Sequence, residues 1–176
     1  MALKEGCEWL FFLDSDVVPG NDVVFRLMSH NIPLVSGLYW RRHPNLEPCM
    51  YKLSPEGIPV TFQPHEVGQG ILQEAEAAGA GCLLINKIVL EKMAPTVESF
   101  ELLNAETKET MVVHKFFEYI IKDKVTLSED VVFFSRAKNL GFKLMVDTGV
   151  RCGHLSTAMV KEGRFNYTPL TLGYEI

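Results

Sequence analysis

A short apolar run that ends on two carboxylates is the feature that most constrains the fold of this chain. No polar residue interrupts Trp9–Leu13, and Asp14 and Asp16 follow it almost at once. A continuous apolar run of this length, without polar alternation, is typical of a strand in the middle of a sheet that is covered on both faces. We therefore expect a buried strand whose carboxyl end leads directly to charged side chains.

Segments with strand and helix patterns alternate along the rest of the chain, which predicts an α/β fold with a mixed sheet flanked by helices. Helical spacing predicts one helix after Asn21 and another that begins at Thr126 or Ser128 and stops at Gly141. The amphipathic segment His114–Lys122 is interpreted as helical. The other expected elements are strands near 34–40, 50–53, 60–62, 82–85, 142–146 and 150–155, a helix over 86–93 and a hairpin within 96–113.

Length, charge and cysteine spacing limit the class of protein. The chain has 176 residues, of which 47% are hydrophobic, and its 17 basic and 22 acidic side chains give a net charge of −5. We expect a single domain over residues 1–176 that binds no nucleic acid, because phosphate binding needs clustered Lys and Arg. No apolar run approaches the roughly 20 residues that cross a bilayer, and the 4 cysteines are widely spaced. A soluble, cytoplasmic protein with reduced thiols and no transmembrane segment is therefore expected.

The segment Asp14-Ser15-Asp16 is the strongest candidate for a functional site. Two carboxylates that lie two residues apart at the end of an extended strand point to the same side. Open α/β sheets bind ligands just beyond the carboxyl ends of their strands. A carboxylate pair is costly there without a partner, and the usual partner is a hard divalent cation with bound phosphate. The alternative is a solvated turn, because Asp and Ser are good turn residues.

Two later segments carry residues that suit catalysis or metal binding. Glu129 and Asp130 begin a predicted helix, where acidic residues either stabilise the helix dipole or, facing a cleft, act as a general base. His154 follows the last strand and is either a surface or core histidine or a metal ligand. Asp16 and His154 would hold the metal with help from Asp14, and a shell of oxygen and imidazole suits Mn²⁺ better than Mg²⁺.

The order of these motifs resembles the nucleotide-sugar glycosyltransferases of the GT-A fold, especially the large family-two group. The resemblance covers nearly the whole chain, from Trp9 to about Leu155. It implies a Rossmann-like fold and the transfer of a sugar from a UDP- or GDP-linked donor to an acceptor. The residues that carry it are the strand before Asp14-Ser-Asp16, Gly79-Ala-Gly-Cys-Leu-Leu-Ile85, Ser128-Glu-Asp-Val-Val-Phe-Phe-Ser-Arg-Ala-Lys-Asn-Leu-Gly-Phe142 and Val146-Asp-Thr-Gly-Val-Arg-Cys-Gly-His154.

The resemblance also implies roles for single residues. Asp16 would bind the metal that holds the nucleotide diphosphate, Asp14 would contact the ribose or sugar, and His154 would complete the metal shell. Asp130 would be the catalytic base in inverting members, whereas in retaining members the pair Glu129-Asp130 positions substrate. Arg42 either flanks the sugar or acceptor or is a solvated charge. The remaining donor-binding candidates are Ser15, Gly79, Gly81, Trp40 and Arg41.

The chain departs from this family at its amino end. Family members open with a βαβ region that cradles the nucleoside base, whereas a single candidate strand and helix precede Asp14 here. We therefore expect an N-terminally truncated form of the fold that keeps its metal-binding and catalytic portion. A truncated reading frame, a two-chain enzyme and a degenerate domain are three explanations. The sheet should then have an unpaired edge, which favours a homo-oligomer or a partner chain.

Two other functions compete with glycosyl transfer. Leu10–Val18 also resembles the opening segment of haloacid-dehalogenase-type phosphatases, in which Asp14 would be the nucleophile and Asp16 the acid/base. That family needs a later acidic pair at the end of an apolar strand, whereas Glu129-Asp130 follows a polar segment and begins a predicted helix. The second alternative is a non-catalytic remnant that binds a nucleotide-sugar weakly or not at all.

Overall fold

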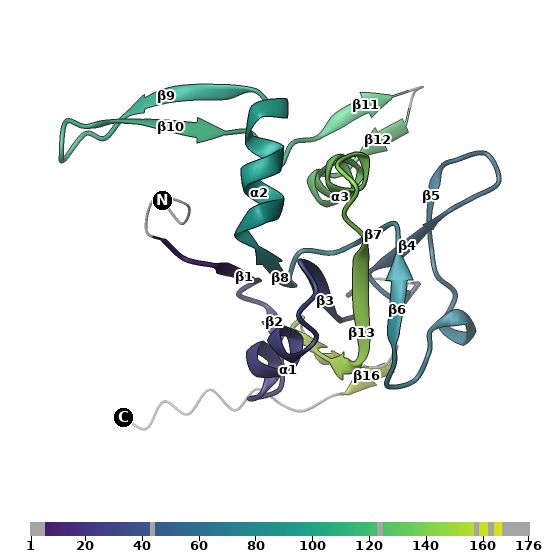
Figure 1. Cartoon of the computed structure of the whole chain (residues 1–176). Helices are drawn as coiled ribbons and strands as arrows, with labels where there is room; N and C mark the ends of the chain where they lie inside the picture. The colour runs from purple at the N-terminus through teal and green to yellow at the C-terminus, as the bar shows by residue number, and fades with distance from the viewer. Residues whose placement is uncertain (1–5, 43–44, 123–124, 157–158, 162–163, 167–176) are drawn as a thin grey trace.

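The computed structural model describes residues 6–42, 45–122, 125–156, 159–161 and 164–166 (Figure 1). Its centre is a five-stranded mixed sheet with the strand order β1-β8-β3-β13-β6. The β3–β13 pair is parallel, and the other three pairs are antiparallel. The strands of this sheet are β1 (Trp9–Leu13), β3 (Leu34–Leu38), β6 (Leu72–Ala75), β8 (Cys82–Asn86) and β13 (Leu144–Arg151).

Helices cover both faces of this central sheet, as the sequence predicts. Leu83 and Ile85 of β8 pack with residues of α2 (Lys87–Met93) and α3 (Glu129–Asn139). Cys82 and Leu84 point to the opposite face and pack with α1 (Val23–Ser29). This alternation follows from the two-residue period of a strand. The protein is therefore a mixed α/β structure with one apolar layer on each side of the sheet.

The other strands form smaller sheets around this centre. The β9–β10 hairpin projects away from the rest of the molecule beyond α2 (Figure 1). One small sheet contains β16, β15, β14 and β2, another contains β5, β4 and β7, and β11 pairs with β12. Their bounds are β2 (Val17–Val18), β4 (Met50–Leu53), β5 (Pro59–Thr61), β7 (Ala77–Ala78), β9 (Ser99–Leu103), β10 (Thr110–His114), β11 (Ile120–Lys122), β12 (Val125–Leu127), β14 (Gly153–His154), β15 (Met159–Lys161) and β16 (Arg164–Asn166). Two 3₁₀ turns, η1 (Pro64–Glu66) and η2 (Ala94–Thr96), complete the elements.

The ends of α2 and α3 follow the local signals in the sequence. The Asn86 side chain caps α2 by accepting a hydrogen bond of 3.1 Å from the backbone N–H of Ile88. Ser128 is the N-cap residue of α3. Gly141 follows the end of α3 with φ of +87°, a conformation that favours glycine and stops the helix.

The position of β1 differs from the sequence prediction. The apolar run Trp9–Leu13 forms the predicted strand, but this strand lies at the edge of the sheet and its side chains are half-buried or, at Leu13, exposed. It pairs with β8 on one side, and no other described strand pairs with it. The interpretation of β1 as a central strand is therefore wrong, whereas an unpaired edge is present among the described residues.

The segment His114–Lys122 is also not helical. His114 ends β10, and Ile120–Lys122 form β11, so the helical interpretation of this segment is wrong. Its apolar side chains lie in different environments. Phe116 and Phe117 pack against the main core, whereas Ile121 is exposed. Tertiary packing of two aromatic rings thus overrides an amphipathic pattern that local sequence alone presents. None of the helices in the described part of the chain has the length and apolar character that crossing a membrane requires.

Candidate functional site

The topology of the central sheet brings the candidate residues to one edge. Strands β1 and β3 both run antiparallel to β8, and β13 runs parallel to β3, so the carboxyl ends of β1, β3 and β13 lie at the same edge. Asp14, Tyr39 and His154 follow these ends. Because β8 runs in the opposite direction, the segment 79–81 that precedes it reaches this edge as well.

Asp16 and His154 meet because two very short strands pair. In the antiparallel β2–β14 pair, His154 lies opposite Val17, and the backbone N–H of Leu155 donates to the carbonyl oxygen of Asp16 at 2.7 Å. This register places Oδ2 of Asp16 at 3.7 Å from Nε2 of His154. Two residues that are 138 positions apart in sequence thus form one contact.

The orientation of the His154 ring is set by a backbone carbonyl. Its Nδ1 lies 2.7 Å from the carbonyl oxygen of Trp40, which only accepts hydrogen bonds, so Nδ1 carries the proton. In the neutral ring, Nε2 then presents its lone pair to the carboxylate of Asp16. The ring also packs edge-on against Tyr39, with 5.2 Å between centroids. Two acceptors that face each other attract when a cation or a proton lies between them.

The spacing of this pair fits a divalent metal. A distance of 3.7 Å between Oδ2 of Asp16 and Nε2 of His154 is less than two metal–ligand bonds of roughly 2.1 Å each, so one ion can contact both atoms. A hydrogen bond from the second ring nitrogen to a carbonyl is also the usual support of a metal-binding histidine. Within the described residues, no three His, Cys, Asp or Glu side chains converge into a complete metal site.

Arg42 contacts Asp16 directly. Its Nη1 lies 2.6 Å from Oδ2 of Asp16, the same oxygen that faces His154. The same guanidinium nitrogen lies 3.5 Å from the carbonyl oxygen of Leu155. Arg42 is therefore an ion-pair partner of the candidate metal ligand and not an isolated solvated charge.

The backbone turns at Asp14, so the two aspartates do not lie on an extended strand. The N–H of Val17 donates to the carbonyl of Asp14 at 3.1 Å, and Ser15 is exposed within this turn. The strand-alternation argument for Asp14 and Asp16 is therefore wrong in its premise. The carboxylate of Asp14 is directed toward Gly81, where a Cβ would lie 2.8 Å from Oδ2 of Asp14.

Tyr39 is a buried residue at the centre of this edge, and no sequence motif points to it. Its hydroxyl accepts a hydrogen bond of 3.0 Å from the N–H of Gly81. A Cβ on Gly79 would lie only 2.0 Å from the same hydroxyl, so glycine is needed there for the close approach. Burial raises the pKa of the Tyr39 phenol, which stays neutral. The one available signal was its place directly before Trp40, at the end of a predicted strand.

Asp130 faces the same glycine-rich segment from the first turn of α3. Its Oδ2 accepts a hydrogen bond of 3.2 Å from the N–H of Ala80. Burial, together with the neighbouring carboxylates of Glu129 and Asp14, raises the pKa of Asp130 to about 6 against the lowering effect of the Ala80 bond. Asp130 contacts Ala80 and Asp14 lies against Gly81, so the two carboxylates share one region.

Glu129 lies beside Asp130 in a different environment. Its Oε2 atom is buried and has no hydrogen-bond partner among the described residues. A hydrogen bond with Glu129 raises the pKa of the exposed Tyr119 phenol. Glu129 is half-buried and contacts Tyr119, which lies between β10 and β11.

Trp40 and Arg41 are neighbours in sequence but make different contacts. Trp40 is buried and supplies the carbonyl that orients His154. Arg41 donates to the Tyr51 hydroxyl at 3.1 Å and lies 3.4 Å from Oε2 of Glu47. Its guanidinium is thus held by the neighbouring loop and strand β4.

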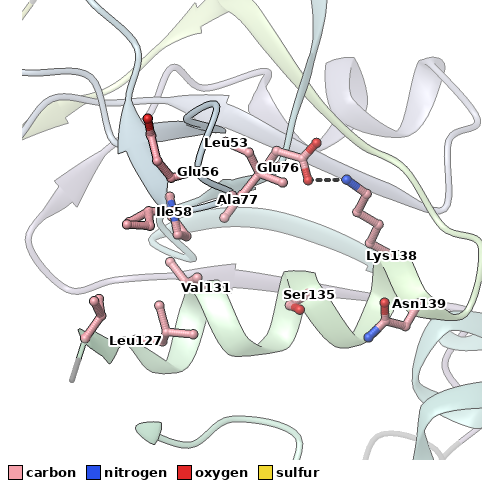
Figure 2. Close-up of a pocket in the computed structure, with 13 residues that line it drawn as sticks. Leu53, Glu56, Ile58, Glu76, Ala77, Leu127, Val131, Ser135, Lys138 and Asn139 are labelled. Atoms are coloured by element: carbon pink, nitrogen blue, oxygen red, sulfur yellow. Dashed lines mark hydrogen bonds and ion pairs between the residues drawn. The ribbon is translucent and has the colours of Figure 1, made fainter. Parts of the chain in front are cut away.

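A groove of about 520 Å³ lies between α3 and the β4–β5 hairpin (Figure 2). Val131, Ser135 and Lys138 line it from α3, and Lys138 forms an ion pair with Glu76. Leu53 and Ile58 line the opposite side. None of the converging site residues lines this groove, although its α3 wall begins one residue after Asp130.

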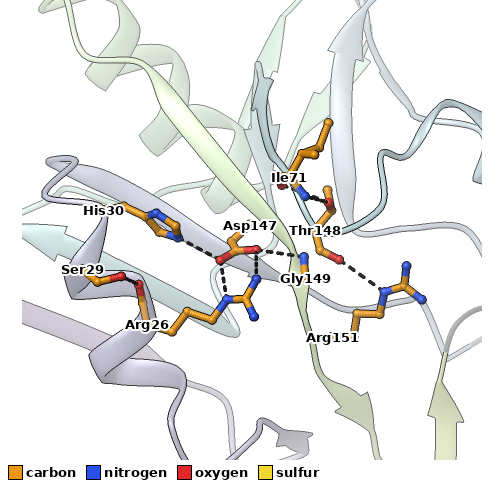
Figure 3. Close-up of polar contacts among 8 residues, drawn as sticks. All are labelled: Arg26, Ser29, His30, Ile71, Asp147, Thr148, Gly149 and Arg151. Carbon is orange, nitrogen blue, oxygen red and sulfur yellow. Dashed lines mark hydrogen bonds and ion pairs between the residues drawn. The ribbon is translucent and has the colours of Figure 1, made fainter.

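A second charged cluster surrounds Asp147 on β13 and is structural (Figure 3). Arg26 donates to it through Nε at 2.7 Å and Nη2 at 2.9 Å, and the N–H of Gly149 donates at 2.8 Å. His30 Nε2 lies 2.8 Å from the same carboxylate. Burial raises the pKa of Asp147, but these bonds outweigh burial and hold the pKa below its usual range. The cluster connects α1 to β13, and both oxygens of the Asp147 carboxylate have hydrogen-bond partners.

Comparisons with known proteins inform the fold only. No protein-family model and no curated protein matches the chain. Among solved structures, the chain is similar to the crystal structure of A197 from STIV, with a TM-score of 0.55 and 18% sequence identity. The match covers 92% of this chain and 66% of A197, so the chain spans less than two thirds of that protein's length. The two proteins share a fold at low sequence identity.

Proposed function

We propose that this chain is the catalytic portion of a metal-dependent glycosyltransferase of the GT-A type, which moves a sugar from a nucleotide-diphosphate donor to an acceptor. The observation that carries the proposal is the approach of Asp16 and His154. Their facing atoms are 3.7 Å apart, and the Trp40 carbonyl leaves the Nε2 lone pair directed at the carboxylate. A divalent cation between them satisfies both groups, and Mn²⁺ suits the mixed oxygen and nitrogen donors.

The surrounding residues support a donor site. Asp14 lies at this edge of the sheet against Gly81, whereas Gly79 and Gly81 are buried against the Tyr39 hydroxyl and shape the edge through that ring. A bound metal would supply a positive charge that stabilises the departing diphosphate. Asp130 would accept the proton of the attacking hydroxyl, because a carboxyl with a pKa of about 6 is mostly ionised at neutral pH and still basic enough to act.

Calorimetry with UDP- and GDP-sugars, with and without Mn²⁺, tests this proposal. We expect metal-dependent binding by the wild-type chain that disappears in Asp16→Ala. The matched control is Glu74→Ala, which removes an exposed carboxylate that pairs with Lys143 on the surface. Absence of binding for every nucleotide-sugar would instead favour a non-catalytic remnant, and binding without turnover would favour a remnant that retains its donor site.

The phosphatase alternative makes a different prediction. Hydrolysis of p-nitrophenyl phosphate with Mg²⁺, abolished by Asp14→Asn, would favour it. Two contacts disfavour an acid/base role of Asp16, since Arg42 pairs with its carboxylate at 2.6 Å and His154 lies beside it. In addition, Glu129 and Asp130 begin α3 and do not end an apolar strand.

A further inference from the structure

One carboxylate oxygen of Asp16 has two neighbours that differ in charge. Arg42 Nη1 lies 2.6 Å from Oδ2, and His154 Nε2 lies 3.7 Å from the same atom. The first contact is an ion pair with a permanently charged group. The second is the contact that a metal ion would bridge under the proposed function.

These two neighbours cannot both keep their places when a metal binds. A divalent ion that contacts Oδ2 of Asp16 would come close to the Arg42 guanidinium, which approaches the same oxygen. Two cations at such a distance in a partly buried site repel each other strongly. Metal binding therefore requires Arg42 to leave Asp16.

His154 is held in place more firmly than Arg42. The His154 side chain is 12% exposed and is held by the Trp40 carbonyl and the Tyr39 ring. The Arg42 side chain is 39% exposed, and its hydrogen bond to the Leu155 carbonyl, the other one it makes among the described residues, is long at 3.5 Å. Arg42 is thus the group that can move.

We propose that Arg42 is a donor-binding residue that neutralises Asp16 in the metal-free protein and transfers to the diphosphate of the donor when the metal takes its place. This inference rests on the proposed function. The chemistry fits, because a guanidinium presents two parallel N–H groups that match phosphate oxygens. No covalent bond forms or breaks in this exchange.

Two titrations of wild type and Arg42→Gln test the two halves of the proposal. In the first, Mn²⁺ alone is titrated, with free Mn²⁺ measured by electron paramagnetic resonance. We expect Arg42→Gln to bind Mn²⁺ at least about fivefold more tightly than wild type, because the competing cation is gone. In the second, UDP and GDP are titrated at saturating Mn²⁺, and we expect the variant to bind the preferred nucleotide at least about fivefold more weakly.

Lys143→Gln is the control, because it removes one positive charge from a surface ion pair with Glu74 and should change neither affinity. Mn²⁺ binding that is unchanged or weaker in Arg42→Gln overturns the proposal. Tighter Mn²⁺ binding with unchanged nucleotide binding overturns the transfer to the diphosphate.

These experiments distinguish a failure of the proposed function from a failure of the proposal for Arg42. If neither wild type nor Arg42→Gln binds Mn²⁺, both the metal site and this inference are wrong. If wild type binds Mn²⁺ and Asp16→Ala does not, the metal site stands, and the comparison with Arg42→Gln decides the role of Arg42 alone.

Discussion

Nδ1 of His154 lies 2.7 Å from the carbonyl oxygen of Trp40, so the chain that leaves β3 sets the orientation of the candidate metal ligand on β14. Nε2 is thereby directed at Asp16 without any rearrangement of the ring. We expect His154→Ala to weaken Mn²⁺ binding at least about tenfold, measured by calorimetry. The control is His65→Ala, which removes an exposed imidazole from η1. Equal affinities in the two variants would exclude His154 as a ligand.

The raised pKa of Asp130 predicts a specific dependence of stability on pH. The folded protein holds the Asp130 proton more tightly than the unfolded chain does, so ionisation of this group costs stability as pH rises from about 4 to about 6. Asp130→Asn removes this cost and should be more stable than wild type by about 1–3 kcal/mol at pH 7, with no gain below pH ~4. Urea unfolding of both proteins between pH 4 and 8 measures the difference. If the unfolding free energies of the two proteins differ by the same amount at every pH, the raised pKa of Asp130 is wrong.

Gly79→Ala should disrupt the site through Tyr39. A Cβ at this position would lie 2.0 Å from the Tyr39 hydroxyl and 2.7 Å from its Cζ, so the ring must move and lose its contact with His154. We expect a loss of about 1–3 kcal/mol in unfolding free energy together with weaker nucleotide-sugar binding. Gly20→Ala is the control, because its Cβ would meet only the end of the Asp22 side chain, at 3.3 Å. If Gly79→Ala behaves like this control, Tyr39 does not constrain the loop.

Asp147→Asn should destabilise the fold without changing ligand binding. The substitution removes a buried charge that pairs with Arg26, and we expect a cost of about 2–4 kcal/mol at pH 7 in urea unfolding. Because contacts with Arg26, His30 and Gly149 lower the pKa of Asp147 against the effect of burial, its contribution is present above the unfolded pKa of about 4 and is lost as pH falls further. Glu74→Gln, at an exposed carboxylate, should cost almost nothing. A deficit that persists unchanged at pH ~3 would contradict this account.

The edge of β1 predicts self-association. It carries apolar side chains, and Leu13 is 47% exposed at its end. Light scattering across a concentration series should show a dimer that Leu13→Lys weakens, because a charge at an edge opposes strand pairing. Leu103→Lys places the same charge at an exposed position of β9 and serves as the control. A monomer at every concentration would count against association through β1.

Local signals in the sequence were sufficient for elements whose pattern is long or distinctive. The strand Trp9–Leu13 and the helix α2 lie where the sequence predicts them. The neighbours of β1 could not be predicted, because a continuous apolar run indicates burial but does not state how many strands pair with it. The helix predicted for His114–Lys122 is wrong because its aromatic residues pack against the main core, a contact that the local pattern does not reveal.

In the candidate site, too, residue types follow from the sequence, whereas their arrangement depends on tertiary structure. Asp16, His154 and Asp130 could be identified from residue type and motif order. Their arrangement depends on β2 and β14, which have two residues each and carry no periodic signal. The roles of Tyr39 and Arg42 arise from contacts across more than 20 residues of sequence, which only the tertiary structure specifies.

We propose that Asp16 and His154 form a metal site for a nucleotide-sugar donor. Calorimetric titration of UDP- and GDP-sugars into the wild-type chain, with Mn²⁺ and then with a chelator in its place, tests it most directly. We expect binding of one nucleotide class that requires Mn²⁺ and is lost in both Asp16→Ala and His154→Ala. Binding that is equal with Mn²⁺ and with the chelator, or that survives in Asp16→Ala, would contradict it.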